Sequence, residues 1–427
     1  MALSNAIDTQ IHIIGLGVAE QAQFSQTAQS ALQTIDAVIG SKRQLETMTL
    51  LLKQKANQPE LHLLPKLTDL PALIDQYQGK SVAVLASGDP LHYGIGRWFS
   101  QNMAHHKLCF YPAISSIQQA CHYLGLSLQD VSVLSLHGRP FEKIRSHLKN
   151  HQTTVVLTDK NSQPQQLAEA CLEAGFERST LTVCENLGYE CQQIRQFSAH
   201  QLAFDKYLNV DPLHVTVIQT LGHGGLLPEF PGFPDDHFIT GCVPGKGMIS
   251  KRETRLSILS LMQPGNDDII WDIGAGCGGV SVELAYWNQG LTVYAIEHHT
   301  DRLHFLNINR SRFGVVSNLH IIEGRAPQCL SPLPLPNKIF IGGSDGELKR
   351  LLELAWNILP ANGILVATAV MDTTRQQLNE FAEVLEDQQV ESVEISVKRG
   401  QLNQGKLAYT RKLPVCIFKF TKTGGTK

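Results

Sequence analysis

The chain has 427 residues, of which 43% are hydrophobic and 18% charged, and its formal net charge is −3. This length exceeds one ordinary domain, and the hydrophobic content is enough for large cores, so we expect two or three globular domains and no membrane span. The nearly neutral charge argues against a nucleic-acid partner, because it provides no broad basic field.

The first half of the chain alternates short apolar strands with helical segments, in two groups. The first group has predicted strands at residues 11–14, 37–40, 81–86, 107–111 and 131–136. The second group has strands at 153–158, 181–185 and 215–220, with a helix at 164–174 closed by Gly175. We therefore expect one domain at 1–221 with two lobes, about 1–140 and 151–221, and a groove between them.

Residues 222–247 contain eleven glycines and prolines, a density that disfavours regular structure and predicts a linker. A second domain is expected at 248–427. Its strands are predicted at 269–273, 292–296, 318–323, 338–341 and 364–370, and its helices at 251–261, 300–313, 346–358 and 373–387. This alternation is typical of a doubly wound parallel sheet. Segments near 390–398 and 414–420 are expected to add antiparallel strands at one edge.

The most informative stretch is Ile269–Gly279, in which an apolar strand ends in a glycine-rich turn and a helix follows. Glycines permit a tight turn and let backbone N–H groups approach a ligand closely. Glu297 ends the next strand, where an acid can accept hydrogen bonds from ribose hydroxyls. Asp272 before the first glycine, and the lack of a second phosphate-binding feature, favour S-adenosylmethionine (SAM) over NAD. The predicted cofactor contacts are Asp272, Gly274, Ala275, Gly276, Cys277, Gly278 and Glu297.

A second candidate motif, Ser87-Gly88-Asp89-Pro90, lies in the first half of the chain. From the residues alone, an ordinary turn is the simpler interpretation. However, Gly88–Gly94 together with Tyr111–Ser116 and Ser135–Arg139 resembles the cobalamin-pathway branch of the tetrapyrrole methylase family. The resemblance implies a two-lobed α/β domain that binds SAM between its lobes. The cofactor contacts it implies are Gly15, Gly17, Gly88, Asp89, Pro90, Tyr93, Ser115 and Ser116.

Two departures from the family pattern concern this first domain. Val18 and Ala19 replace the Pro-Gly of many members, and His92 replaces a common aromatic residue. The first departure affects the cofactor contact that the resemblance implies for the loop after the first strand.

The second half resembles the decarboxylating methyltransferases of the same pathway. The matching pieces are Gly247–Arg255, Asp272–Gly278, Glu323–Pro327 and Ile339–Gly343. This resemblance implies a Rossmann-like methyltransferase domain and adds Ser250 and Ala326 as cofactor contacts. The two halves together imply SAM-dependent methylation of a precorrin at C5 by the first domain. They also imply methylation at C15, with loss of CO2 from the C12 acetate, by the second domain, and one SAM site in each.

Such a substrate carries many carboxylates, so an acidic protein needs local cations to bind it. The candidates for substrate contacts are Lys251, Arg255, Arg325, Gly342, Gly343, His137 and Arg139. Each charged side chain could equally lie on a solvated helix face, and His137 could stabilise a turn. No catalytic nucleophile is required, because the electron-rich macrocycle supplies the attacking carbon. Family resemblance also implies a homo-oligomer.

Three alternatives stay open at this point. The chain could be a Rossmann methyltransferase that acts on RNA or another small molecule and has an N-terminal substrate domain. It could also be a non-enzymatic carrier of a tetrapyrrole or cobalt, or an enzyme acting on a cobalt-containing precursor. Nine scattered cysteines without a C-x-x-C pair favour the reducing cytoplasm over a disulfide framework. The histidines form no zinc motif, and we expect no dedicated metal site.

Overall fold

The computed structural model describes residues 9–22, 24–53, 58–224, 227–386 and 389–423. The chain divides into two compact units, Met1–Gly138 with Asn150–His223 (unit 1) and Arg139–Lys149 with Gly224–Lys427 (unit 2). Within the described residues, no helix is long and apolar enough to cross a membrane.

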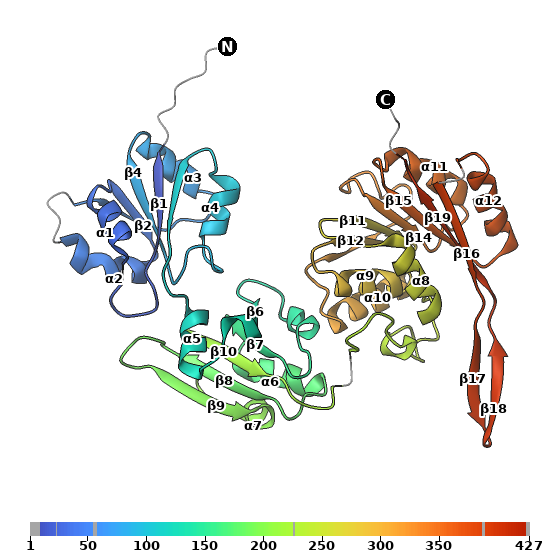
Figure 1. Ribbon diagram of the computed structural model, residues 1–427, viewed down its shortest axis with the longest axis horizontal. Coiled ribbons are helices and arrows are strands. Elements are labelled where there is room, and N and C mark those ends of the chain that lie inside the picture. Colours follow the sequence, from blue (N-terminus) through green and yellow to red (C-terminus); the bar gives the residue numbers. More distant parts are fainter. Residues whose placement is uncertain (1–8, 23, 54–57, 225–226, 387–388, 424–427) are drawn as a thin grey trace, which may run out of the picture. The chain divides into compact units, whose positions relative to one another are not determined.

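The first sheet of unit 1 has five parallel strands in the order β3-β2-β4-β1-β5 (Figure 1). Its central strands are mostly apolar and almost entirely buried, as expected for strands covered on both faces. The strands are β1 (Gln10–Gly15), β2 (Ala37–Gly40), β3 (Glu60–Leu63), β4 (Ser81–Ala86) and β5 (Lys107–Tyr111). The helices are α1 (Gln26–Gln33), α2 (Lys42–Lys53), α3 (Leu70–Ile74) and α4 (Gly96–Asn102).

The second sheet of unit 1 is mixed, in the order β6-β7-β10-β8-β9; only β6 and β7 pair in parallel. The strands are β6 (Val131–Ser135), β7 (Thr153–Leu157), β8 (Thr180–Glu185), β9 (Gln193–Ser198) and β10 (His214–Gln219). The helices are α5 (Ser116–Leu124), α6 (Pro164–Glu173) and α7 (Ala199–Phe204). The sequence did not predict β3 and β9, because both are edge strands with exposed, polar-rich faces.

Unit 2 is built on a seven-stranded sheet in the order β13-β12-β11-β14-β15-β19-β16, in which β19 runs antiparallel to both its neighbours. The strands are β11 (Ile269–Ile273), β12 (Thr292–Glu297), β13 (Leu319–Glu323), β14 (Lys338–Ile341), β15 (Ile364–Ala369), β16 (Val390–Ile395) and β19 (Val415–Thr421). Strand order reverses between β11 and β14, and ligands bind at such switch points in open α/β sheets.

Helices cover both faces of this sheet, which confirms the predicted doubly wound fold. Ile270 of β11 packs in one core with residues of α8 (Arg252–Met262), α9 (Gly279–Trp287) and α10 (Thr300–Arg312). Its neighbour Trp271 points to the opposite core, with α11 (Leu348–Ile358) and α12 (Asp372–Ala382). The alternation follows from the two-residue period of a strand.

The range predicted as a linker, 222–247, is not a free connection between domains. Much of its described part packs in unit 2. Phe233 and Phe238 are fully buried, and their rings lie 4.9 and 4.7 Å from that of Phe313. Glycine and proline density indicates irregular backbone, but it does not tell whether that backbone packs on a core.

A segment from the first half of the chain also packs in unit 2. It contains the 3₁₀ segment η3 (Phe141–Ser146), which contacts α10. Arg145 Nη1 donates to Ser311 O at 3.2 Å, and a Cβ on Gly314 would lie 2.7 Å from Glu142 O. The close approach explains why glycine stands at position 314.

A two-stranded hairpin, β17 (Lys398–Asn403) with β18 (Lys406–Arg411), projects from the body of unit 2 (Figure 1). The sequence analysis did not predict it. Almost all of its side chains are exposed, so it lacks the apolar alternation that marks a half-buried strand.

We predict that Gly188→Ala destabilises unit 1 more than Gly125→Ala. Both glycines have positive φ, so each substitution carries backbone strain of about 1–2 kcal/mol. Only at position 188 would the Cβ also clash, 2.0 Å from Val18 O, whereas it meets nothing within 4 Å at position 125. Scanning calorimetry of the two variants measures the difference; equal shifts of the unit 1 transition would contradict this account.

Candidate functional site

The glycine turn of unit 2 lies at the carboxyl end of β11, as predicted. Gly274, Gly276 and Gly278 all have positive φ, the conformation that favours glycine. A Cβ on Gly274 would lie 2.5 Å from Gly343 O, and Gly342 N donates to Ile273 O at 2.9 Å. The structure therefore brings the Gly342–Gly343 pair after β14 against the glycine turn.

The segment before α8 lies directly on this glycine turn. Cys277 N donates to Met248 O at 3.0 Å, and a Cβ on Gly276 would lie 2.6 Å from that same oxygen. Ile249 packs against Gly279 in the same way. Ser250, a predicted cofactor contact, belongs to this covering segment, and so does the backbone preceding Lys251.

Glu297 lies where a ribose-binding acid was predicted, at the end of β12, and is 3% exposed. Its Oε2 accepts from Gly276 N at 2.9 Å, and its Oε1 accepts from His298 N and His299 N, also at 2.9 Å. The carboxylate thus holds the glycine turn in place. Oε2 has capacity for a further donor, so this role is compatible with a ribose contact.

Asp272 is a buried carboxylate with unused hydrogen-bonding capacity. It is 1% exposed, and its Oδ2 accepts from Ser281 Oγ. Its Oδ1 has no partner among the described residues. Burial, with a smaller contribution from the charge of Glu297, raises the pKa of Asp272 to about 7. A buried acceptor beside a glycine turn fits a ligand that bears an ammonium group, as the methionine end of SAM does.

Arg325 and Ala326 follow β13 on the same edge of the sheet. Arg325 Nη2 lies 2.6 Å from Asp345 Oδ2, and its side chain stays more than half exposed. Ala326 is 9% exposed. Arg325 is therefore accessible to a ligand although it already has one carboxylate partner.

Arg255 requires a correction, because the structure excludes the predicted substrate contact. Its side chain is fully buried. Its Nε lies 2.5 Å from Glu283 Oε1, its Nη1 lies 3.2 Å from Asp235 Oδ1, and its remaining hydrogen bonds go to the carbonyls of Ser250 and Phe233. Arg255 is a structural residue. Its partner Glu283 could have been suspected from sequence, as the single charged residue of the mostly apolar helix α9.

The predicted site of unit 1 gathers at the carboxyl ends of β1 and β4. A Cβ on Gly15 would lie 2.5 Å from Gly88 O, and Gly88 N donates to Gly17 O at 3.2 Å. Pro90 follows in the same turn, and its Cδ would lie 3.1 Å from a Cβ on Gly15. These close approaches are enough to explain why glycine stands at positions 15 and 88, even without a ligand. They also leave backbone groups exposed to a ligand at the carboxyl edge of the sheet, where ligands of α/β proteins bind.

The neighbouring turn is tied to helix α5. Asp89 Oδ1 accepts from Leu91 N at 2.8 Å and from His92 N at 3.0 Å. His92 Nδ1 lies 3.0 Å from Oγ of Ser115, which caps α5 one residue before Ser116. His92 therefore links two predicted cofactor segments, a contact that the sequence did not indicate.

Three further candidates lie on or after β6 in the chain or contact it. Tyr93 is half-exposed, has a φ of 59°, and donates its hydroxyl to Val133 O at 3.2 Å. His137 is exposed in a turn stabilised by a hydrogen bond from Gly138 N to Asp159 Oδ2 at 2.8 Å. Arg139 begins the segment that packs in unit 2.

Comparison with known proteins matches both halves of the chain. Residues 10–203 match the family described as Tetrapyrrole (Corrin/Porphyrin) Methylases, and residues 243–422 match the Precorrin methyltransferase domain. A relative from Sinorhizobium sp, named Precorrin-6Y C(5,15)-methyltransferase (decarboxylating), is 33% identical over 360 residues, 84% of each chain. A relative from Mycobacterium tuberculosis with the same name is 30% identical over 362 residues, 84% of this chain and 87% of its own.

A shorter relative matches only part of the chain. It comes from Methanothermobacter thermautotrophicus and is named "Probable cobalt-precorrin-6B C(15)-methyltransferase (decarboxylating)". It is 34% identical over 188 residues, which are 43% of this chain and 93% of the relative.

We predict that Arg255→Met lowers the free energy of unfolding by about 3–5 kcal/mol, because it leaves Glu283 buried without its cationic partner. Arg350→Met is the matched control. Arg350 is 62% exposed and pairs with Glu347 at 3.9 Å, so its loss costs about 1 kcal/mol or less. Urea unfolding followed by tryptophan fluorescence measures both. An unchanged midpoint for Arg255→Met, with weaker substrate binding, would restore the original assignment.

We predict that Asp272→Asn is more stabilising at pH 8 than at pH 5. The raised pKa means that the folded state binds more protons than the unfolded state between about pH 4 and about pH 7. Asp272 therefore makes unfolding easier as the pH rises through this window, and asparagine removes that effect. Urea midpoints at the two pH values test it. Asp301→Asn, at an exposed position of α10, should leave the difference between them unchanged.

Proposed function

Because the chain belongs to the family of precorrin-6Y C5,15-methyltransferases (decarboxylating), we propose that it methylates a precorrin at C5 and C15 and releases one carboxyl group as CO2. The methyl donor is SAM. Unit 1 methylates C5. Unit 2 methylates C15 and decarboxylates the C12 acetate.

The observation that carries this proposal is the buried Asp272 beside the glycine turn of unit 2. Its free Oδ1 and raised pKa fit the ammonium group of the donor, whose positive charge favours the ionised carboxylate. Glu297 accepts a hydrogen bond from Gly276 N of the turn, and Met248 O of the covering segment accepts one from Cys277 N. Backbone and two carboxylates therefore support one proposed ligand position at this turn.

Bound SAM supplies an electrophilic methyl group, and the macrocycle supplies the electron-rich carbon. The residues of the chain bind, orient and desolvate the two reactants, which lowers the barrier by several kcal/mol. The glycine turns allow this close placement because they add no side chain between backbone and ligand. Decarboxylation needs an electron sink, which the conjugated macrocycle provides.

The division of labour has separate support. The family name contains two methylation positions, and the chain contains two matched domains. The shorter relative, named for C15 alone with decarboxylation, matches less than half of the chain. We propose one SAM site per unit on this basis. We also propose a cytoplasmic homo-oligomer, which the free cysteines and the exposed apolar side chains of the β17–β18 hairpin support.

Incubation with precorrin-6Y and SAM, followed by mass spectrometry, tests the proposal. The wild type should add two methyl groups and lose one CO2. Gly276→Ala, whose Cβ would lie 2.6 Å from Met248 O, should add one methyl group and retain the carboxyl. Gly15→Ala, whose Cβ would lie 2.5 Å from Gly88 O, should lose methylation at C5.

Calorimetry with SAM is the companion measurement. Two molecules should bind per wild-type chain and one per chain of either variant. A wild type that binds one molecule, or that transfers no methyl group to precorrin-6Y, would contradict the proposed function.

A further inference from the structure

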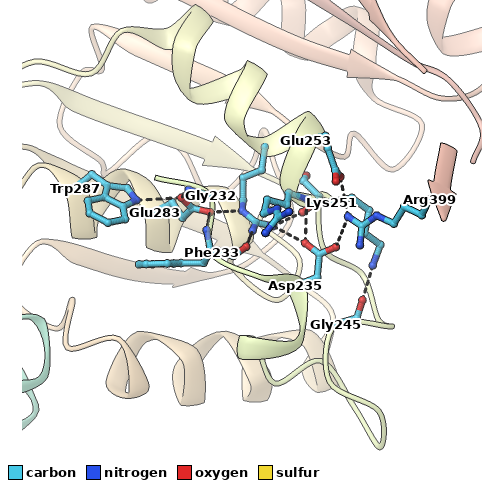
Figure 2. Close-up of polar contacts among 12 residues, drawn as sticks. Gly232, Phe233, Asp235, Gly245, Lys251, Glu253, Glu283, Trp287 and Arg399 are labelled. Atoms are coloured by element: carbon cyan, nitrogen blue, oxygen red, sulfur yellow. Dashed lines mark hydrogen bonds and ion pairs between the residues drawn. The ribbon is translucent and has the colours of Figure 1, made fainter. Parts of the chain in front are cut away.

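The base of the β17–β18 hairpin lies beside the segment that covers the glycine turn of unit 2. Lys412 N donates to Val397 O at 3.0 Å, which closes the base just beyond the Lys398–Arg411 pair. Arg399, the second residue of β17, reaches from the hairpin to Asp235 and Glu253 (Figure 2). This places the start and end of the hairpin against residues 235–253.

Arg399 holds this arrangement through two carboxylates. Its Nη2 lies 2.7 Å from Glu253 Oε2 and 3.2 Å from Asp235 Oδ2. The other oxygen of Asp235 accepts from the buried Arg255 Nη1 at 3.2 Å and from Arg252 N at 2.9 Å. One carboxylate therefore connects the hairpin to the interior of unit 2, and both carboxylates are neutralised by arginine.

Three lysines at the same place have no carboxylate partner among the described residues. Lys246 and Lys412 are exposed, and Lys251 is half-buried with its Nζ donating to Gly245 O. Burial lowers the pKa of Lys251; the charge of Asp235 raises it, and the charges of Arg399, Lys412 and Lys246 lower it further. Positive charge is thus concentrated around Lys251, where Asp235 is shared with two arginines and none of the three lysines forms an ion pair among the described residues.

This cationic cluster lies next to the predicted ligand position. Met248, between Lys246 and Lys251, accepts from Cys277 N of the glycine turn at 3.0 Å. The Met248 side chain is 60% exposed and offers apolar surface at the same place. A flat ligand with an apolar ring and acidic side chains matches this combination.

We propose that Lys246, Lys251 and Lys412 form a carboxylate-binding rim of the unit 2 site, and that Arg399 is the residue that positions Lys412 in it. The inference rests on the proposed function and specifies which residues take the acidic side chains of the macrocycle. Ammonium groups bind carboxylates as compact charges with rotatable donors. Carboxylates bound here also relieve the repulsion among the lysines.

The test uses the full chain, with Lys406→Gln as a matched control. Lys406 lies in the same hairpin but opposite Asn403, beside the distal turn. Lys412→Gln should raise the KM for precorrin-6Y in C15 methylation roughly three- to fivefold at low ionic strength. Lys246→Gln with Lys412→Gln should raise it about tenfold, since the two contacts add. Lys406→Gln should stay within about twofold of the wild type, and the effects should shrink at high salt.

The positioning role of Arg399 has its own readout. Arg399→Gln should raise the same KM, and adding Lys412→Gln to it should raise it little further, because the two residues act through one contact. Arg399→Lys should restore part of the affinity. Fully additive effects would overturn the positioning role.

Three measurements separate the possible failures. Lys412→Gln indistinguishable from Lys406→Gln would overturn the rim. A changed SAM affinity in Lys412→Gln, measured by calorimetry, would indicate that the lysines contact the cofactor and would also overturn the carboxylate-binding rim. A wild type that makes no C15-methylated product would instead refute the proposed function. Unchanged thermal unfolding of the lysine variants, together with a raised KM, would support the rim.

Discussion

The ion pair between Arg255 and Glu283 is the interaction on which the architecture of unit 2 depends. Both side chains are fully buried, and removing either one would leave a buried charge without its partner. Glu283 also accepts from Gly232 N, Phe233 N and Trp287 Nε1, so its two oxygens tie helix α9 to the irregular segment before α8. A segment without α-helix or strand is thereby attached to the core of unit 2.

The position of the candidate active site follows from this constraint. The segment fixed by Glu283 and Asp235 continues into Met248, which contacts the glycine turn, and then into α8. Asp235 also receives Arg399 from the projecting hairpin. The same network of ion pairs therefore connects three parts of unit 2: the core, the segment at Met248 that lies on the glycine turn, and the lysine cluster at the base of the hairpin.

At the candidate site of unit 1, the contacts among the described residues that place the turns are backbone contacts and hydrogen bonds rather than buried ion pairs. There the carboxyl ends of β1 and β4 meet through glycine backbone, and the contact between Gly15 and Gly88 leaves no room for a side chain. His92 and Ser115 join the next turn to α5 by one hydrogen bond. Both units bring glycine backbone close together at the edge of a parallel sheet, and unit 2 adds buried ion pairs that fix the segment covering its turn.

Local sequence determined the strands β11, β12, β14 and β15, the glycine turn and the acid at Glu297, because strand period and glycine backbone freedom depend on adjacent residues. It also determined the two-domain α/β class and the family resemblance. Only the tertiary structure decided that Arg255 points inward, that Phe233 and Phe238 lie in the core, and that Arg399 anchors a hairpin. The reason is physical: Arg255 meets Glu283 28 positions away and Arg399 meets Glu253 146 positions away, so their directions depend on packing that no local pattern records.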